Sequence, residues 1–375
     1  MKKLNFLFLI LLILVGCKNA EDLNTGLYFT GTEVDPSMKV AIEGPTDFAL
    51  TVSSTVKAPT DTRIKIAASP DLVEEYNMKY KKNYKALPEG SYNLSTDELH
   101  LAAGETVSDQ VTVALTSLDD FEEGVTYCMP ISIVSTDGET PVLESSRTIY
   151  VEFVRTIITS AAVTTRNYFR APFDKDNKWS AVPNLTLEAR VYVNQFQSAF
   201  PNISSVIGIE EHFLLRFGHG TVDNMNQLHL AGGGYEVTAP FKFSTHTWYH
   251  VAVTYDGAKI RIFVNGVEDA SVDAPRGPIN IALNEGLHDG FNVGKSAGGR
   301  YMDGMVSEVR VWSKALSGND LLNNMCYVDP AADGLIAYWR FNEGQGNVIK
   351  DLTGHGYDMV DNGKVTWKEG VRCPN

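Results

Sequence analysis

Trp248-Tyr249-His250-Val251-Ala252-Val253-Thr254-Tyr255-Asp256-Gly257 is the stretch of this 375-residue chain that decides its fold. Successive side chains of an extended chain point to opposite faces. One face of this stretch carries Tyr249, Val251, Val253 and Tyr255, and the other carries Trp248, His250, Ala252 and Thr254. Asp256-Gly257 and the later Asn265-Gly266 are strong hairpin-turn signals. The pattern therefore predicts consecutive antiparallel strands of one sheet.

The rest of the chain repeats this pattern of short alternating or β-branched runs between Gly-rich turns. Such runs occupy residues 64–67, 111–115, 148–154 and 260–264. Many short strands with regular turns are typical of β-sandwiches, so we expect an all-β protein with few short helices. Helical periodicity predicts one helix over residues 71–82, with Asp71 as its N-cap, and a second short turn over 317–324.

The first 17 residues predict export and lipid attachment. Lys2 and Lys3 precede an apolar run over residues 4–16, and Leu14-Val15-Gly16-Cys17 matches a lipobox. A membrane-spanning helix is the alternative, but it needs about 20 apolar residues. We therefore expect residues 1–16 to be a signal peptide and Cys17 to be lipidated, which anchors the protein to the outer membrane. The following Lys18-Asn19-Ala20-Glu21-Asp22 resembles the acidic segment that directs Bacteroidetes lipoproteins to the cell surface.

Charge and cysteine usage narrow the function classes. The formal net charge is −14, which argues against nucleic acid as a partner, because that binding relies on Lys and Arg. Three cysteines remain after Cys17. Cys128 lies in a strand-like run and is expected to be a buried free thiol. Cys326 and Cys373 are the candidate disulfide pair in an oxidising exported compartment.

Loss of strict alternation after residue 155 divides the chain into two domains. We place the first at residues 24–155 and the second at 156–375, with the polar stretch 156–177 as the join. Residues 71–77, 84–92 and 127–131 resemble the N-terminal domain of many Bacteroidetes surface lipoproteins, an Ig-like sandwich. The Pro and Gly residues form a turn and the Tyr residues fill the core of that domain. Folding alone explains these residues, so the motif identifies a family but no site.

The second half resembles the laminin-G-like, concanavalin A-like jelly roll. The resemblance is carried by residues 185–192, 248–257, 262–266, 301–312 and 339–344. It implies a two-sheet sandwich and a surface protein that captures glycans, host N-glycans among them, for a glycan-utilisation system. It also implies a surface glycosidase and a TonB-dependent transporter as partners.

The sequence offers no convincing catalytic motif, so we expect a binding protein and name no catalytic residue. Glu308 has no acidic neighbour at even spacing along its strand, and the adjacent Glu210 and Glu211 point to opposite faces. A glycoside hydrolase is one alternative, and it would need two carboxylates about 5 to 10 Å apart across a groove. A protein-binding adhesin is another, and it would need a flat apolar patch of interface size.

Two kinds of ligand site are candidates. Asp351 and Asp358 flank Leu352-Thr353-Gly354-His355-Gly356-Tyr357, which resembles the calcium loop of some laminin-G-like domains. The alternative for this loop is a Gly-rich turn in which Asp351 bonds the backbone. Sugar binding needs aromatic faces and planar polar groups on exposed loops. The candidates are Trp179, His219, Asp223, Tyr235, Arg300 and Tyr301, each of which has packing in the sandwich as its alternative role.

Overall fold

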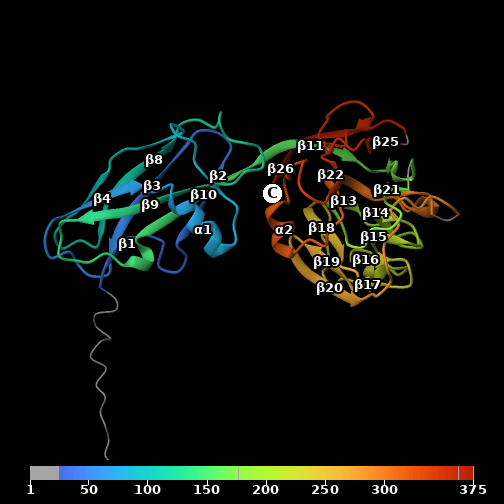
Figure 1. The fold of residues 1–375 in the computed structure, drawn as a ribbon, viewed down its shortest axis with the longest axis horizontal. Coiled ribbons are helices and arrows are strands. Elements are labelled where there is room, and N and C mark those ends of the chain that lie inside the picture. Colours follow the sequence, from blue (N-terminus) through green and yellow to red (C-terminus); the bar gives the residue numbers. More distant parts are fainter. Residues whose placement is uncertain (1–24, 176, 287, 362, 375) are drawn as a thin grey trace, which may run out of the picture. The chain divides into compact units, whose positions relative to one another are not determined.

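The chain folds into two compact β units, Met1–Arg155 and Thr156–Asn375 (Figure 1). The computed structural model describes residues 25–175, 177–286, 288–361 and 363–374. The predicted signal peptide and Cys17 lie outside the described residues. Strands dominate both units, which confirms the all-β prediction. None of the described helices is long and apolar enough to cross a membrane.

The N-terminal unit is a sandwich of two sheets around one core. Sheet A has the order β1 (Leu27–Phe29), β3 (Thr46–Ser54), β8 (Val107–Leu115), β6 (Tyr92–Leu94). Sheet B has the order β2 (Ser37–Ile42), β10 (Thr148–Arg155), β9 (Tyr127–Thr136), β4 (Thr62–Ala68), β7 (Glu98–Leu101), with β5 (Lys85–Ala86) on β9. Alternation places Val111 and Val113 of sheet A against Ile131 and Val151 of sheet B in that core. A 3-10 turn at Glu144–Ser146 precedes β10.

One helix, α1 (Leu72–Tyr80), packs on sheet B through Val73 and Tyr76. Asp71 occupies the predicted N-cap position, but its backbone is helical, with φ −61° and ψ −22°, and its side chain makes no capping hydrogen bond. The physical reason is an earlier start, because the N–H of Leu72 already donates to the Ser69 carbonyl. The helix covers Cys128, which is a buried free thiol as expected. Burial and the nearby Glu152 raise the pKa of this thiol to about 12.

The C-terminal unit is a larger two-sheet sandwich. Sheet C has the order β20 (Val267–Asp273), β19 (Lys259–Val264), β18 (Trp248–Tyr255), β13 (Leu185–Gln195), β22 (Asp303–Trp312), β11 (Ile157–Val163), β26 (Trp367–Cys373), with β23 (Leu335–Trp339) on β22. Sheet D has the order β17 (Val237–Thr238), β16 (Leu228–Ala231), β15 (Phe213–Phe217), β14 (Ser204–Ile209), β21 (Phe291–Val293), β12 (Phe169–Ala171), β25 (Met359–Asp361), β24 (Val348–Ile349). Three 3-10 turns lie at Phe173–Lys175, Val222–Asn224 and Ala297–Gly299.

Residues 248–257 and the strand that follows them form the predicted hairpin. β18 and β19 pair in antiparallel register, with Val253 opposite Ile262. Val251, Val253 and Tyr255 face the core between sheets C and D, as their alternation predicts. The opposite face of sheet C is also covered. Leu321 of α2 (Gly318–Asn323) packs there on Ala252, and Ser317 begins that helix with a capping box.

The turn residue Asp256 gives a prediction for the effect of pH on stability. Its carboxylate accepts hydrogen bonds from Arg261 and from the N–H groups of Ala258 and Lys259. The Arg261 guanidinium, followed by the backbone donors, lowers the pKa of Asp256 to about 2, from an ordinary 3.8. Between these pH values the folded state binds fewer protons than the unfolded state. The contribution of Asp256 to the free energy of unfolding is therefore complete above pH 3.8 and is lost as the pH falls through 2.

We expect Asp256→Ala to lower the free energy of unfolding at pH 7 by about 1 kcal/mol, because the partly exposed ion pair is screened. The loss should shrink toward pH 2. All five tryptophans lie in the C-terminal unit, so denaturant titration followed by tryptophan fluorescence reports on this unit. Asp273→Ala, whose carboxylate is 85% exposed, is the control and should cost little. A loss that is equal at pH 7 and pH 2 would contradict the prediction.

A disulfide joins Cys326 to Cys373 of β26 across 47 residues of chain. The loop that it closes contains β23 and β26 of sheet C and β24 and β25 of sheet D, so its removal should destabilise the C-terminal unit. We expect the double variant Cys326→Ser, Cys373→Ser to lose about 2 to 4 kcal/mol of unfolding free energy. Tryptophan fluorescence in guanidinium chloride measures it. Cys128→Ser is the matched control. Equal midpoints for the parent and the double variant would refute the expectation.

Candidate functional site

The face of sheet D that points away from the core carries an unusual set of buried polar side chains. In β15, Phe213, Leu215 and Phe217 belong to the core, so alternation turns Leu214 and Arg216 to the other side. The same alternation turns His229 of β16 outward, opposite Arg216 in the register. We call this side of sheet D the Arg216 face. Its polar members are Arg216, His229, Ser205, Asn292 and Arg170.

Arg216 is the central cation of this face and is only 7% exposed. Its Nε is buried and has no hydrogen-bond partner among the described residues. Burial lowers the pKa of the guanidinium, while the negative charges of Glu210, Glu211 and Glu236 act in the opposite direction. A buried polar group without a partner is costly. Arg216 therefore has the properties of a donor that a ligand completes.

A second buried group without a full set of partners lies two strands away. Asn292 of β21 is 2% exposed, and β14 lies between β15 and β21. Its amide nitrogen donates to Asp289, but no described residue donates to its buried Oδ1. Arg216 thus offers a donor and Asn292 an acceptor on the same face. This pairing of functions suits a ligand with hydroxyl groups.

The loop before β22 docks on the Arg216 face through polar contacts. Arg300 Nη1 lies 2.5 Å from Glu210 Oε1, and the N–H of Ala297 donates to the same carboxylate. The hydroxyl groups of Ser205 and Ser296 lie 2.6 Å apart. The structure therefore brings the predicted residue Arg300 to this face, although Glu210 already binds part of its guanidinium.

Next to Arg300, aromatic rings and a shallow pocket extend the site. Tyr301 lies with its ring centroid 6.3 Å from that of Tyr168, and Lys295 Nζ lies 4.2 Å from the Tyr168 centroid. Both tyrosines are half-buried. A pocket of about 350 Å³ adjoins Tyr168, and its lining comprises Tyr168, Arg170, Pro172, Asp358, Val360 and Asp361. The predicted Tyr301 thus gains a partner, Tyr168, at the edge of a concavity.

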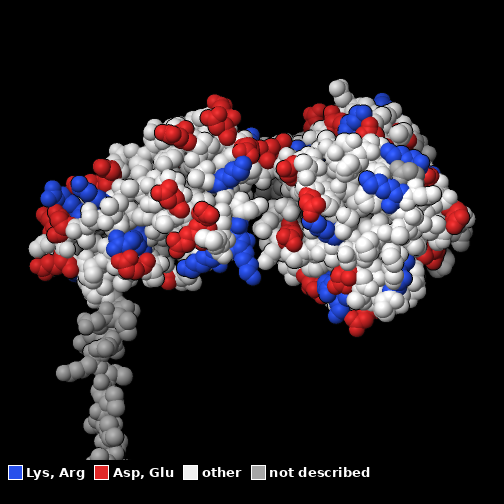
Figure 2. Space-filling view, viewed as in Figure 1, with Lys and Arg blue, Asp and Glu red and all other residues white. Residues whose placement is uncertain are grey.

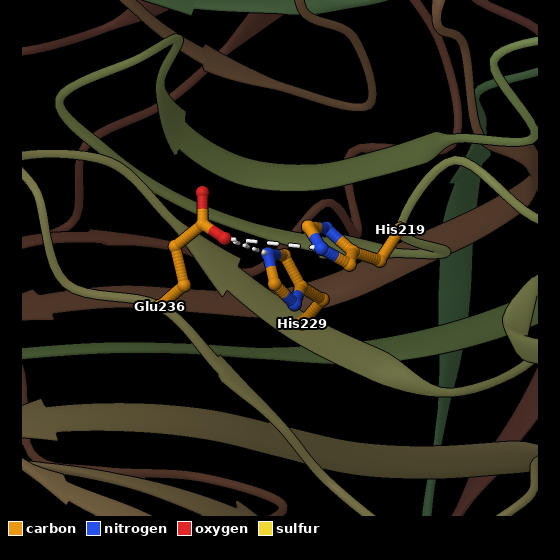
Figure 3. A group of neighbouring side chains, drawn as sticks. All are labelled: His219, His229 and Glu236. Atoms are coloured by element: carbon orange, nitrogen blue, oxygen red, sulfur yellow. Dashed lines mark ion pairs between the residues drawn. The ribbon is translucent and has the colours of Figure 1, made fainter.

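At the other end of the face, His219 and Glu236 approach His229 (Figure 3). The imidazole rings of His219 and His229 stack with centroids 4.0 Å apart. Glu236 Oε2 lies 3.8 Å from His219 Nε2 and 3.9 Å from His229 Nε2. Of the three residues, His219 was predicted from the sequence, whereas His229 and Glu236 were not. Alternation in Leu228-His229-Leu230 was the available signal for His229.

Three other predicted glycan residues have different surroundings. Trp179 packs against the core, and its indole N–H donates to the Tyr357 hydroxyl at 2.7 Å. Tyr235 also packs against the core, on the side opposite Glu236. Asp223 is exposed in its 3-10 turn. Core packing accounts for Trp179 and Tyr235 without a ligand, and their part in glycan binding stays a prediction.

The carboxylates of the predicted calcium loop already have donors from the protein. Asp351 accepts hydrogen bonds from the N–H groups of Tyr338, Thr353 and Tyr357. Asp358 pairs with Lys350 at 2.6 Å. This is the arrangement of a turn held by its Asp side chain, and a calcium ion would have to replace these donors. Calcium at this loop stays a prediction, and these contacts weigh against it.

A pair of buried carboxylates in sheet C bears on the enzyme alternative. Glu188 and Glu308 are 0% and 1% exposed, and Arg310 lies between them, 3.4 Å and 2.5 Å from their nearest oxygens. His250 Nε2 and Trp312 Nε1 bind Glu188 at 2.7 Å each. Both carboxylates are thus bound by protein groups rather than directed into a groove. They stabilise the fold, and the glycosidase arrangement of facing, accessible carboxylates is not what these two residues form.

Charged groups elsewhere are mixed in sign. On the side of the molecule in Figure 2, acidic and basic side chains are interspersed over the described residues of each unit.

The fold and a sequence family together define the class of the C-terminal unit. Residues 161–321 match the model of the concanavalin A-like lectin/glucanases superfamily, so the unit carries a concanavalin A-like domain and the laminin-G-like resemblance is confirmed. Residues 23–140 match a second family model, which describes an N-terminal domain. No curated protein matches the chain.

Among solved structures, the chain is similar to a "putative carbohydrate binding protein" from Bacteroides ovatus ATCC 8483. The two are 28% identical, the TM-score is 0.61, and the match covers 92% of this chain and 97% of that one. Bacteroides thetaiotamicron EndoBT-3987 with Man5GlcNAc product matches at 17% identity and TM-score 0.30, over 34% of this chain and 30% of its own. Domain 4 of the Geobacillus stearothermophilus arabinanase AbnA, in complex with arabinotriose, matches at 20% identity and TM-score 0.33, over 44% and 75%.

Proposed function

We propose that this protein is a surface lipoprotein that binds a glycan on the Arg216 face of its C-terminal unit and does not cleave it. The observation that carries the proposal is the pair of buried, incompletely bonded groups on that face, Arg216 Nε and Asn292 Oδ1. The two residues lie two strands apart, so different hydroxyl groups of a glycan would accept from the first and donate to the second. The similarity to the Bacteroides ovatus protein, over nearly the whole of both chains, supports the same function.

Sugar binding also uses aromatic rings, which contact the C–H groups of the pyranose. Tyr168 and Tyr301 supply two half-buried rings beside the polar groups. The pocket of about 350 Å³ next to Tyr168 also contains Arg170 and Asp358. We propose that one sugar unit contacts Tyr168 at this pocket and that the chain of sugars continues across the sheet toward Arg216.

The cellular role is also proposed. Cys17 would carry the lipid, the N-terminal unit would act as a spacer, and the C-terminal unit would present the Arg216 face to the surroundings. The bound glycan would pass to a surface glycosidase and a TonB-dependent transporter. Lipid labelling of the expressed protein, lost in Cys17→Ala, tests the anchor.

The first experiment is a glycan array with the protein from Lys18 onward, which retains every described residue, in calcium and in a chelator of divalent cations. Selective binding of one glycan class, together with no released product by mass spectrometry, is the expected result. Released product would replace the binding role by the hydrolase alternative. Binding to no glycan would overturn the proposal and favour the adhesin alternative. Binding that chelation abolishes would show a metal requirement, and Asp351→Asn would test whether the Asp351 loop supplies it.

A further inference from the structure

His219, His229 and Glu236 bring three metal-binding groups to one point at the end of the Arg216 face (Figure 3). They come from three places in the chain: the loop after β15, strand β16, and the residue before β17. Their ligand atoms all lie within 4.8 Å of one another. Two imidazole nitrogens and one carboxylate oxygen are the donor set of several zinc sites.

His229 is oriented as a metal ligand is. Its Nδ1 lies 2.8 Å from the Thr238 hydroxyl, and this second contact fixes the ring, as outer partners do in known metal sites. The side chain is 2% exposed. Its Nε2 is buried without a hydrogen-bond partner among the described residues, and it faces Glu236. When Nδ1 donates to Thr238, the lone pair of Nε2 is available at the centre of the cluster.

The distances suit an ion between the three groups better than direct contacts. At 3.8 and 3.9 Å, the Glu236 oxygen is too far from the two Nε2 atoms for hydrogen bonds. Zinc bonds of about 2.0 to 2.1 Å in a tetrahedron separate neighbouring ligand atoms by roughly 3.3 Å. His219 and Glu236 are exposed, so both side chains have room to move. To bind one ion, His219 would rotate out of its stacked contact with His229 and Glu236 would approach the two rings.

The charges around the cluster are compatible with a bound cation. Arg216 opposes a second positive charge, and Glu236 offsets it. Imidazole ligands favour zinc and its transition-metal neighbours over calcium and magnesium, which prefer oxygen.

We propose that His219, His229 and Glu236 bind one divalent transition-metal ion of the zinc class, with a coordination position left open to water or a ligand oxygen. The proposal goes beyond glycan binding and does not depend on it. The site lies beside Arg216, so an ion there would add a Lewis acid to the same face.

The test is calorimetric titration of metal-free, tag-free protein from Lys18 onward with zinc chloride and, separately, with calcium chloride. We expect one equivalent of zinc to bind and calcium to give no saturable heat. His219→Gln and Glu236→Gln should each weaken zinc binding at least tenfold, and both replace exposed side chains, so the fold is kept. His100→Gln, an exposed histidine in the N-terminal unit, is the control and should bind as the parent does.

Absence of a one-equivalent zinc transition would overturn the metal site, and so would parent-like binding by both His219→Gln and Glu236→Gln. Tryptophan-monitored unfolding of each variant separates a lost ligand from a lost fold. Because the titration contains no glycan, its failure is distinct from failure of the glycan array. Either result can be obtained with or without the other.

Discussion

Arg216→Met is expected to remove most of the glycan affinity of the protein without unfolding it. The guanidinium is central on the Arg216 face and has a buried donor that no described residue satisfies. A hydrogen bond from a charged group contributes about 1.5 to 3 kcal/mol, which corresponds to a dissociation constant roughly 10- to 150-fold higher. Methionine keeps the length of the apolar stem but offers no donor. Calorimetric titration with the glycan found on the array measures the change.

The same substitution should leave stability unchanged or raise it. Arg216 forms no ion pair within the described chain, so no acidic group directly neutralises its buried charge. Removing such a charge is not expected to lower the free energy of unfolding. Arg261→Met is the control, because Arg261 of β19 lies in sheet C and pairs with Asp256. It should bind glycan as the parent does. Parent-like affinity in Arg216→Met, or its unfolding, would show that Arg216 is a structural residue instead.

The strands could be predicted from the sequence, whereas Arg216 and His229 of the candidate site could not. The reason is that alternation of side chains describes one strand at a time. Alternation within residues 248–255 fixes which side chains face the core, because it is a property of one strand. The site instead depends on which strands are neighbours. Arg216 sits in Phe213-Leu214-Leu215-Arg216-Phe217, which reads as a buried apolar strand. Only its register with β16 places it opposite His229, and no feature of either strand alone predicts that.

Packing against neighbouring residues decides which of the predicted loop residues lie at the Arg216 face. Composition predicts Arg300 and Tyr301, since a Gly-rich loop with aromatic and polar residues is a usual place for a site, and the structure places both beside the Arg216 face. Trp179 met the same criterion, yet its indole packs against the core. Tyr235 packs against the core, whereas the adjacent Glu236 is exposed and lies in the cluster with the two histidines. The aromatic residue was the predicted one of the two.

Glu308 shows the same limit for charged residues. Positions 306 and 310 of its own strand carry no acidic residue. Its partners are instead basic and hydroxyl groups, one from the same strand and two from β23 and the residue after it. A bulge in β22 places two residues opposite Ala189 of β13, and Glu308 has a left-handed φ of 51° there. Its carboxylate accepts from Arg310, Arg340 and the Tyr338 hydroxyl. A bulge that redirects a side chain has no simple sequence signal.

We therefore expect Glu308→Gln to cause a large loss of stability in the C-terminal unit. It removes one charge from a buried network and leaves Arg310 with Glu188 as its remaining close carboxylate, 3.4 Å away. Breaking a buried ion pair on one side costs about 3 to 5 kcal/mol, because the other charge stays in the interior. Guanidinium unfolding, followed by the tryptophans of this unit, measures the loss.

The control is Glu268→Gln in the same unit, whose side chain is 46% exposed and 3.7 Å from Arg261. An exposed pair contributes about 0 to 1 kcal/mol, so this variant should unfold almost as the parent does. The double variant Arg310→Met, Glu308→Gln should lose less unfolding free energy than the sum of the two single losses. Each single variant leaves one buried charge without its partner, whereas the double variant removes both charges. Additive losses would mean that Glu308 and Arg310 do not act as a pair. Equal stability of Glu308→Gln and Glu268→Gln would mean that the network does not hold the two central strands of sheet C together.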